Sequence, residues 1–482
     1  MAALHQGSGQ VQPPAQPPTT TVPTQGTGIK PENAVVGSPP QNEKLPTVPA
    51  NQPDVRAEQP LTIEEAANLA EQNAFAVRTA ASQVEATRQR INQARGALGP
   101  QVNSTGVYTR YPEAQTAQIN PDSPPIVIQP IDTRQASVSF QLPIDISGNL
   151  NRNVRAAQAN NRASRQTLQA QRNQARLNGR NAFIGVLRAA AAVRVQEQAV
   201  ADATENLRIQ TVRFNAGDIA RVNVVRASAQ LEQANSDLIN AQNNLQTAKE
   251  NFNNVLARPI ETPVTLAEIP ALPNVTADPQ ELVANAQRSR PEVLSLQETQ
   301  TALANSRRAL EAGQNPSLAV GINTSRNFDP GAFGQKTTTV GTVTLNVPLF
   351  DSGITRARVR EARQFEEQNR ILLQQTELAV SLQVRQAVTN LISARARLAS
   401  AQQQVALSEE NLRIARVRNQ AGEGIFLEII DAETQLTQAR NQLVSARYDY
   451  LNAYAALQQA VGTDQINGAA PPPAPQEGTS SK

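Results

Sequence analysis

The stretch VPLFDSG at residues 347–353 has a counterpart earlier in the chain, LPIDISG at residues 142–148. The two copies are 205 residues apart, and the same offset aligns two copies of ENLRI, at residues 205–209 and 410–414. An offset that stays constant over such a distance leaves no net insertion between the copies, so the sequence predicts two repeats and a pseudo-symmetric chain. The same offset pairs four further residues, Arg213 and Gly217 with Arg418 and Gly422.

Each copy of the motif is followed by a long stretch without proline, residues 144–258 and 349–470. Apolar residues recur there every seven positions, which predicts pairs of long helices packed as coiled coils. A helix over residues 149–213 would be about 98 Å long at 1.5 Å per residue. The ladders are Val186, Val193, Val200 and Leu207, then Val224, Leu231, Leu238, Leu245 and Phe252, then Val384, Leu391, Leu398, Val405 and Leu412, then Ile429, Leu436, Leu443, Tyr450 and Leu457. Alanines run beside the second and fourth ladders, at 227, 234, 241 and 248 and at 432, 439, 446 and 453.

Four strands are expected, two in each repeat, at residues 102–110, 136–142, 317–324 and 339–347. Apolar and polar residues alternate along each of them over the roughly 9–11 residues that a tilted membrane strand requires. Each pair forms a hairpin around a polar loop, preceded in its repeat by a helix and followed by the long helix pair. A hairpin of a soluble protein would show the same alternation and stays open as an alternative.

The composition excludes several classes of protein. Aromatic residues make up 3% of the 482 residues and Trp is absent, which disfavours a thick globular core and favours long helices. The net charge is +3, from 44 basic and 41 acidic residues, so a nucleic-acid partner is not expected. The chain lacks Cys, and its one histidine is His5, so no cofactor, metal site or catalytic residue is predicted.

The ends of the chain are rich in proline, with 12 of the 32 prolines in residues 1–60. We expect disordered tails at 1–60 and 463–482, repeats at 61–257 and 278–462, and a linker at 258–277. No window reaches the roughly 18 apolar residues of a membrane-spanning helix, so any membrane crossing is expected to use strands. The first residues also lack the basic and apolar regions of a signal peptide.

The corner motif, the Arg-x-x-x-Gly sequences and their duplication in register resemble the TolC family of outer-membrane factors over about residues 61–462. The resemblance implies a homotrimer that is mainly α-helical. Four strands per chain would close one 12-stranded transmembrane β-barrel in outer-membrane lipid, and the helices would form an α-barrel tunnel through the periplasm of a diderm bacterium. Four strands alone leave unpaired edges in lipid, and this agrees with closure by several chains.

The function implied is that of an exit duct without enzymatic activity, in a tripartite efflux or type I secretion system with a periplasmic adaptor and an inner-membrane pump. A trimeric coiled-coil structural or surface protein is the main rival, because it would explain the heptads. It would not explain why a hairpin precedes each helix pair. An enzyme is a third class, and the sequence offers no nucleophile–base pair, phosphate loop or metal cluster for it.

The site residues of this reading fall into two groups at the ends of the helices. Glycine at the tips supplies the left-handed conformation that ends a helix, and the resemblance implies that the tips also dock an adaptor. The tip residues are Arg213, Gly217, Arg418 and Gly422, and the strand-to-helix corners are Pro143, Gly148, Pro348 and Gly353.

An acidic pair, Glu428 and Asp431, follows the second tip, while its counterparts in the first repeat are Asn223 and Arg226. Residues three apart share one helix face. The resemblance implies that three chains bring six such carboxylates into a ring that gates a cation-selective pore. A solvated helix face paired with arginines is the alternative.

Two positions depart from the pattern of some relatives. Gly424 stands where these carry a gate arginine, and Asn419 stands where they carry an aromatic residue. The closing contacts of those relatives therefore do not transfer to this chain, and Phe426 is a candidate substitute.

Overall fold

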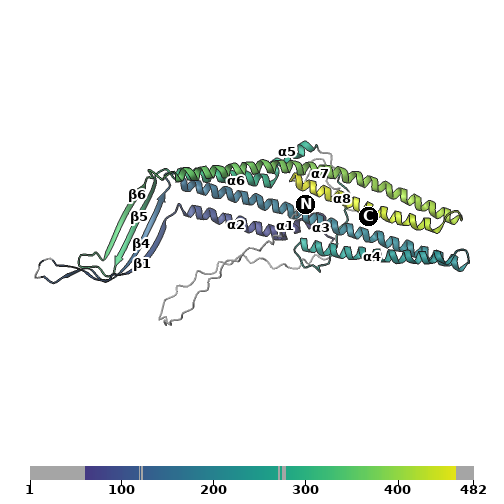
Figure 1. The fold of residues 1–482 in the computed structure, drawn as a ribbon, viewed down its shortest axis with the longest axis horizontal. Coiled ribbons are helices and arrows are strands. Elements are labelled where there is room, and N and C mark those ends of the chain that lie inside the picture. The colour runs from purple at the N-terminus through teal and green to yellow at the C-terminus, as the bar shows by residue number, and fades with distance from the viewer. Residues whose placement is uncertain (1–59, 119, 121–122, 270–271, 274–277, 463–482) are drawn as a thin grey trace, which may run out of the picture. The chain divides into compact units, whose positions relative to one another are not determined.

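The computed structural model describes residues 60–118, 120, 123–269, 272–273 and 278–462, which lie in one compact unit, Glu58–Lys482. Apart from Pro60, the tails predicted at 1–60 and 463–482 fall outside the described residues, as does part of the linker. The elements are α1 (Ile63–Asn73), α2 (Phe75–Gly96), β1 (Gln101–Arg110), β2 (Gln115–Ala117), β3 (Ile126–Gln129), β4 (Asp132–Ile144), α3 (Asn149–Asn215), α4 (Arg221–Val255), α5 (Pro279–Ser289), α6 (Pro291–Ala312), β5 (Ser317–Asn327), β6 (Thr337–Asn346), α7 (Ile354–Gln420) and α8 (Phe426–Val461) (Figure 1).

The duplication is visible in the lengths of the helices. The long helices α3 and α7 have 67 residues each and begin 205 positions apart, at Asn149 and Ile354. At 1.5 Å per residue each is about 100 Å long. Both start directly after a glycine in the left-handed conformation, Gly148 (φ 71°) and Gly353 (φ 82°). The predicted long helices and their duplication are confirmed.

The start of each repeat differs from the single helix that the sequence suggested. Each repeat begins with two helices, of 11 and 22 residues, separated by one extended residue. In the second repeat this residue is Arg290 (ψ 123°), and Pro291 after it disfavours the helical region for its neighbour. Ala74 (ψ 128°) repeats the geometry without a proline.

The first repeat has a longer hairpin than the second. The elements of the two repeats are offset by 216 residues up to the first strand of each β-hairpin, as from Gln101 of β1 to Ser317 of β5. The long helices after the β-hairpins are offset by 205. The 11 additional residues lie between β1 and β4, where the predicted polar loop contains a small antiparallel ladder of β2 with β3. The two-residue alternation of the sequence does not reveal this ladder, because the apolar run of β3 is short and prolines lie on both sides of it.

The heptad ladders form the seams of two helical hairpins, the first made of α3 and α4 and the second of α7 and α8. In the second hairpin, ladder residues such as Val384, Leu391, Ile429 and Leu457 are buried. The alanines beside the seams are buried as well, among them Ala227, Ala234, Ala241, Ala432 and Ala439. Coiled-coil packing with close helix approach at alanine is therefore confirmed.

The four predicted strands form one antiparallel sheet in the order β1-β4-β5-β6. Its register places one residue of each strand in each cross-strand row, as in Val102–Phe140–Ile322–Gly341. Alternate rows point to opposite faces, so one face is mainly apolar and the other mainly polar. Exceptions include Val107 and Val340 on the polar face and Ser104 and Arg326 on the apolar face. The apolar face carries Val102, Val138, Phe140, Leu142, Ile144, Leu318, Val320, Ile322, Val343 and Leu345, and the polar face carries Asn103, Thr105, Ser137, Ser139, Gln141, Asn323, Ser325, Thr338, Thr342 and Thr344.

The apolar face is not covered within the single chain. Val343 is 73% exposed and Val102 65%, and Ile322 and Leu345 are exposed too. No described helix has an apolar stretch of the length needed to cross a membrane.

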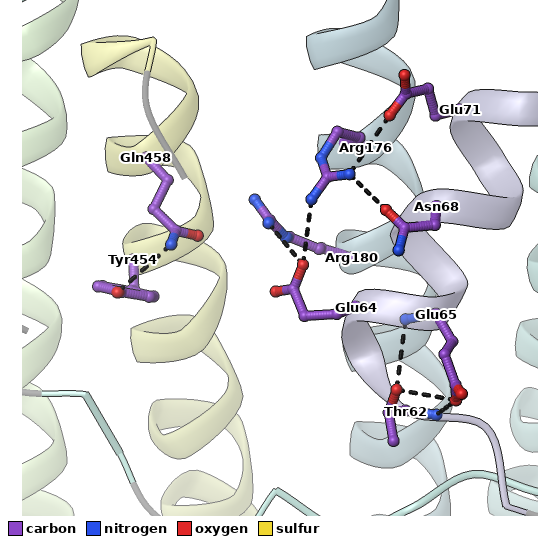
Figure 2. Close-up of polar contacts among 9 residues, drawn as sticks. All are labelled: Thr62, Glu64, Glu65, Asn68, Glu71, Arg176, Arg180, Tyr454 and Gln458. Atoms are coloured by element: carbon purple, nitrogen blue, oxygen red, sulfur yellow. Dashed lines mark hydrogen bonds and ion pairs between the residues drawn. The ribbon is translucent and has the colours of Figure 1, made fainter. Parts of the chain in front are cut away.

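Helix α1 packs closely on α3 at Gly179. A Cβ added to Gly179 would lie 2.7 Å from Ala70 Cβ and 3.0 Å from the Ala66 carbonyl oxygen, both on α1. Figure 2 shows two arginines of α3 reaching over the same helix. Arg180 donates to Glu64 at 2.9 Å, and Arg176 is within 3.3 Å of both Glu64 and Glu71.

Substituting Gly179→Ala should therefore lower stability by about 1–3 kcal/mol, because the methyl group forces two packed helices apart. Gly185→Ala is the matched control on the same helix, since no atom lies within 4 Å of its added Cβ. The control should leave stability unchanged or raise it by up to about 1 kcal/mol. Thermal melting of the purified variants measures both effects, and equal melting temperatures would contradict the close approach.

Candidate functional site

Both strand-to-helix corners are closed by an aspartate that accepts backbone N–H groups at the start of the long helix. Asp145 accepts from Leu150 at 3.1 Å and Asn151 at 2.9 Å, and Asp351 accepts from Gly353 at 3.0 Å and Thr355 at 2.8 Å. The Thr355 side chain, together with the backbone bonds from Thr355 and Gly353, holds the pKa of the Asp351 carboxyl below its usual range. The carboxylate also suits the positive end of a helix.

The prolines of the corners occupy different places. Pro143 lies inside β4, opposite Ala319 of β5 and past the last residue of β4 that pairs with β1. Pro348 follows the end of β6. A strand end tolerates a proline because few ladder hydrogen bonds are lost there.

The tips of the two hairpins have the conformation expected of their glycines. Gly217 (φ 84°) and Gly422 (φ 79°) are left-handed, and a Cβ at either would meet no atom within 4 Å. Asp218 N–H donates to the Arg213 carbonyl oxygen, and Glu423 N–H donates to that of Arg418, both at 2.9 Å. Such bonds close the end of an α-helix on a glycine. A side chain introduced at Gly217 or Gly422 would therefore point into open space in the single chain.

The side chains of the tip arginines are engaged within the chain. Arg213 of α3 donates to the side-chain oxygen of Asn419 of α7 at 3.2 Å, so it joins the two hairpins. Arg418 forms an ion pair with Glu428 at 3.0 Å and also donates to the Glu423 carbonyl oxygen. Asn419 in turn donates to the Gly424 carbonyl oxygen at 3.0 Å.

The two carboxylates of the acidic pair have different surroundings. Glu428 is half-buried and paired with Arg418, as in the solvated-face alternative, whereas Asp431 is exposed. Phe426 is buried in an apolar cluster with Leu412, Ile429 and Leu436.

Sequence reasoning missed a buried carboxylate five residues beyond Glu428. Glu433 of α8 is 6% exposed and accepts from Arg416 of α7 at 2.9 Å and from Asn206 of α3. It adjoins the seam position Ala432, and an acidic residue beside a heptad seam was the available signal. Glu433 also lines a cleft of about 1120 Å³ between the two hairpins, with Asp202, Arg226, Arg397, Arg440 and Asp449 among the other lining residues.

Comparison with known proteins identifies the family. The model of the outer membrane efflux protein family matches residues 66–258 and 282–463, which cover both repeats. The chain belongs to this family. It is thus an outer-membrane channel of the efflux and secretion systems of Gram-negative bacteria and not an enzyme, as the sequence predicted. The rival reading as a structural coiled-coil protein is set aside.

Several relatives share most of the length of the chain. The outer membrane efflux protein BepC of Brucella suis is 24% identical over 64% of this chain and 68% of its own. The cobalt-zinc-cadmium resistance protein CzcC of Cupriavidus metallidurans is 24% identical over 86% and 91%. In structure, the chain is similar to the CmeC outer membrane channel of Campylobacter jejuni, with a TM-score of 0.70 at 18% identity over 83% and 85% of the two chains. Members of this family form trimeric channels.

Proposed function

We propose that three copies of this chain form one continuous exit duct, with the sheets closed into a barrel in the outer membrane and the helices forming a tunnel below it. The observation that carries the proposal is the four-stranded sheet, which has one apolar face, one polar face and two open edges. A periplasmic adaptor and an inner-membrane pump would complete the system, and the choice of cargo would belong to the pump.

The open edges fit closure by identical neighbours. Neighbouring strands are antiparallel throughout, so the edge strands β1 and β6 run in opposite directions. β6 of one copy therefore meets β1 of the next as an antiparallel partner. Closure would satisfy the backbone groups of both edges, which lipid cannot do, and would leave the apolar face toward lipid and the polar face toward the lumen.

The long helices support the same assembly. Many large apolar residues of α7 are exposed in the single chain, and a neighbouring copy would cover them. They include Phe365, Ile371, Leu372, Leu378, Leu382 and Ile392.

We further propose that residues 61–257 and 278–462 are the two repeats and that 258–277 is the linker between them. The element lengths support this division, because helices of 11, 22 and 67 residues occur once in each repeat.

The sheet provides a direct test of the barrel. Ile322→Lys places a charge on the apolar face and should reduce the amount of folded trimer in outer membranes, at a cost of about 2–4 kcal/mol near the bilayer centre. Asn323→Lys, the next residue of β5, places the same charge on the polar face and should assemble normally. Quantifying heat-resistant trimer in membrane fractions compares the two. Equal losses would contradict the assigned faces.

The tips are proposed to dock the adaptor. Support comes from the open space around Gly217 and Gly422, which leaves both turns accessible in the single chain. The backbone of Arg213 and Arg418 closes the turns, and their side chains brace them from within the chain.

Substituting Gly422→Gln should abolish export while trimers still assemble, because the new side chain occupies the docking surface. The left-handed conformation itself costs about 1–2 kcal/mol. Gly353→Gln is the matched control, with φ of +82° and no atom within 4 Å of the added Cβ. Complementation of a strain lacking the gene measures export. If both variants lose export equally, the effect is backbone strain and the docking proposal fails.

We propose that Glu428 and Asp431 of three copies form an acidic ring at the inner end of the tunnel. Asp431 is exposed, and the ion pair of Glu428 with Arg418 orients that carboxylate beside the tip. A ring of carboxylates in a narrow pore attracts cations, multivalent ones most strongly.

A trivalent cation should therefore block single-channel current through the wild-type trimer from the tip side. Glu428→Ala with Asp431→Ala should abolish the block. The control is Glu409→Ala with Glu410→Ala, which removes the same number of charges from the exposed surface of α7. Block that persists in the first double variant, or that disappears equally in both, would rule out the ring.

A further inference from the structure

The contact between the two hairpins near their tips depends on one buried carboxylate. Glu433 lies on α8, Asn206 on α3 and Arg416 on α7, so three helices from both hairpins meet at this side chain. Its two oxygens have different partners, since Oε1 accepts from Arg416 and Oε2 accepts from Asn206. One side chain thus joins the first hairpin to the second.

Apolar packing between the hairpins is thin at this level. The buried cluster there consists mainly of residues of the second hairpin, such as Leu412, Phe426, Ile429 and Leu436. The first hairpin adds Ala227 and the partly buried Leu207. A buried polar contact therefore carries a large share of the specificity with which the hairpins meet, because an unpaired carboxylate there would be costly.

The contact is absent from the other repeat. The counterparts of Arg416 and Glu433 at the offset of 205 are Thr211 and Ser228, which form no ion pair. Asn411, the counterpart of Asn206, donates to Gln435 at 3.3 Å inside the second hairpin. Seams and exposed ion pairs such as Glu205–Arg208 and Glu410–Arg413 are duplicated, so the Glu433 contact is not part of the coiled-coil packing that the two repeats share.

We propose that Glu433 is a positioning residue of the channel, which holds the second hairpin against the first through Asn206 and thereby sets the width of the tunnel at its inner end. This inference rests on the proposed function, in which the tips form that end. The Arg213–Asn419 bond between the same two hairpins lies closer to the tips and adds a second, partly buried link.

Burial of the Glu433 carboxyl gives the contact a pH dependence. The charged groups that act on this carboxyl are Arg416 of α7 and Asp202 of α3. Arg226 of α4 and Arg440 of α8 line the same cleft, and Arg440 is paired with Glu409. Burial raises the pKa of the Glu433 carboxyl, although the hydrogen bonds from Arg416 and Asn206 act in the opposite direction. Separated hairpins would expose the carboxyl to water and return its pKa to the ordinary value of about 4.3.

The direction of the pH effect follows from the linkage between proton binding and hairpin packing. The packed arrangement has the higher pKa and binds the proton more tightly, so acidification between the raised value and the ordinary one favours packed hairpins. Rising pH through the same window favours their separation. Conductance should therefore fall as the pH falls through this window.

The first experiment compares Asn206→Ala with Asn411→Ala, the same change at the repeat counterpart. Asn206→Ala removes the bond between hairpins and leaves the Arg416–Glu433 pair in place. Spin labels on cysteines at the exposed tip positions 218 and 423 report the separation of the tips, and the chain has no other cysteine. Labelled chains are diluted with unlabelled ones, so that distances within one chain are measured.

Asn206→Ala should broaden and lengthen the distance distribution and raise single-channel conductance several-fold, while Asn411→Ala should match the wild type. Glu433→Gln keeps the shape of the side chain but cannot titrate, so the pH-dependent shift of the wild-type distance should be lost. Identical distances in the two asparagine variants, or an unchanged pH shift in Glu433→Gln, would overturn the proposal. A wild-type trimer that does not conduct would refute the proposed function alone, because the distances are measured independently of current.

Discussion

The unpaired edges of a four-stranded sheet are the constraint on which the rest of the structure depends. Each backbone group on the free sides of β1 and β6 needs a partner, and lipid provides none. An amphipathic sheet with antiparallel edges can meet this requirement by joining copies of itself. In the proposed channel, oligomerisation is therefore a consequence of the strand number. The positions of the helices follow from the corners that join them to the sheet.

The strand-to-helix corners fix how the long helices leave the sheet. Each one combines a left-handed glycine with an aspartate that accepts helix N–H groups, so α3 and α7 leave the sheet in the same way. From there the heptad seams keep the helices paired over their length. The duplicated seams supply stability, and the few unduplicated contacts, such as Glu433 with Asn206 and Arg416, distinguish one hairpin from the other.

The sequence allowed prediction of those features that repeat with a simple period. Seven-residue spacing located the long helices, and two-residue alternation located the four strands, with β4 starting at Asp132 where residue 136 was expected. Features set by single residues were missed. The break at Arg290 depends on the proline after it, and the ladder of β2 with β3 is too short for alternation to be recognised.

The candidate site was predictable only in part, for a related reason. The left-handed tip glycines follow from local chain geometry, and Glu428 and Asp431 follow from spacing on one helix. Partners from other helices do not, because Arg213 and Asn419 are 206 residues apart and Asn206 and Glu433 are 227 apart. Asn419 and Gly424 depart from the pattern of some relatives. The packed tips show that Asn419 donates to the Gly424 carbonyl oxygen and accepts from Arg213.

The most direct measurement is of the whole chain extracted from outer membranes in detergent, with its mass and its single-channel conductance determined on the same sample. The account predicts a particle of three 51.8 kDa chains that conducts ions in a planar bilayer. A monomer with an intact sheet, or a trimer that carries no current, would contradict it.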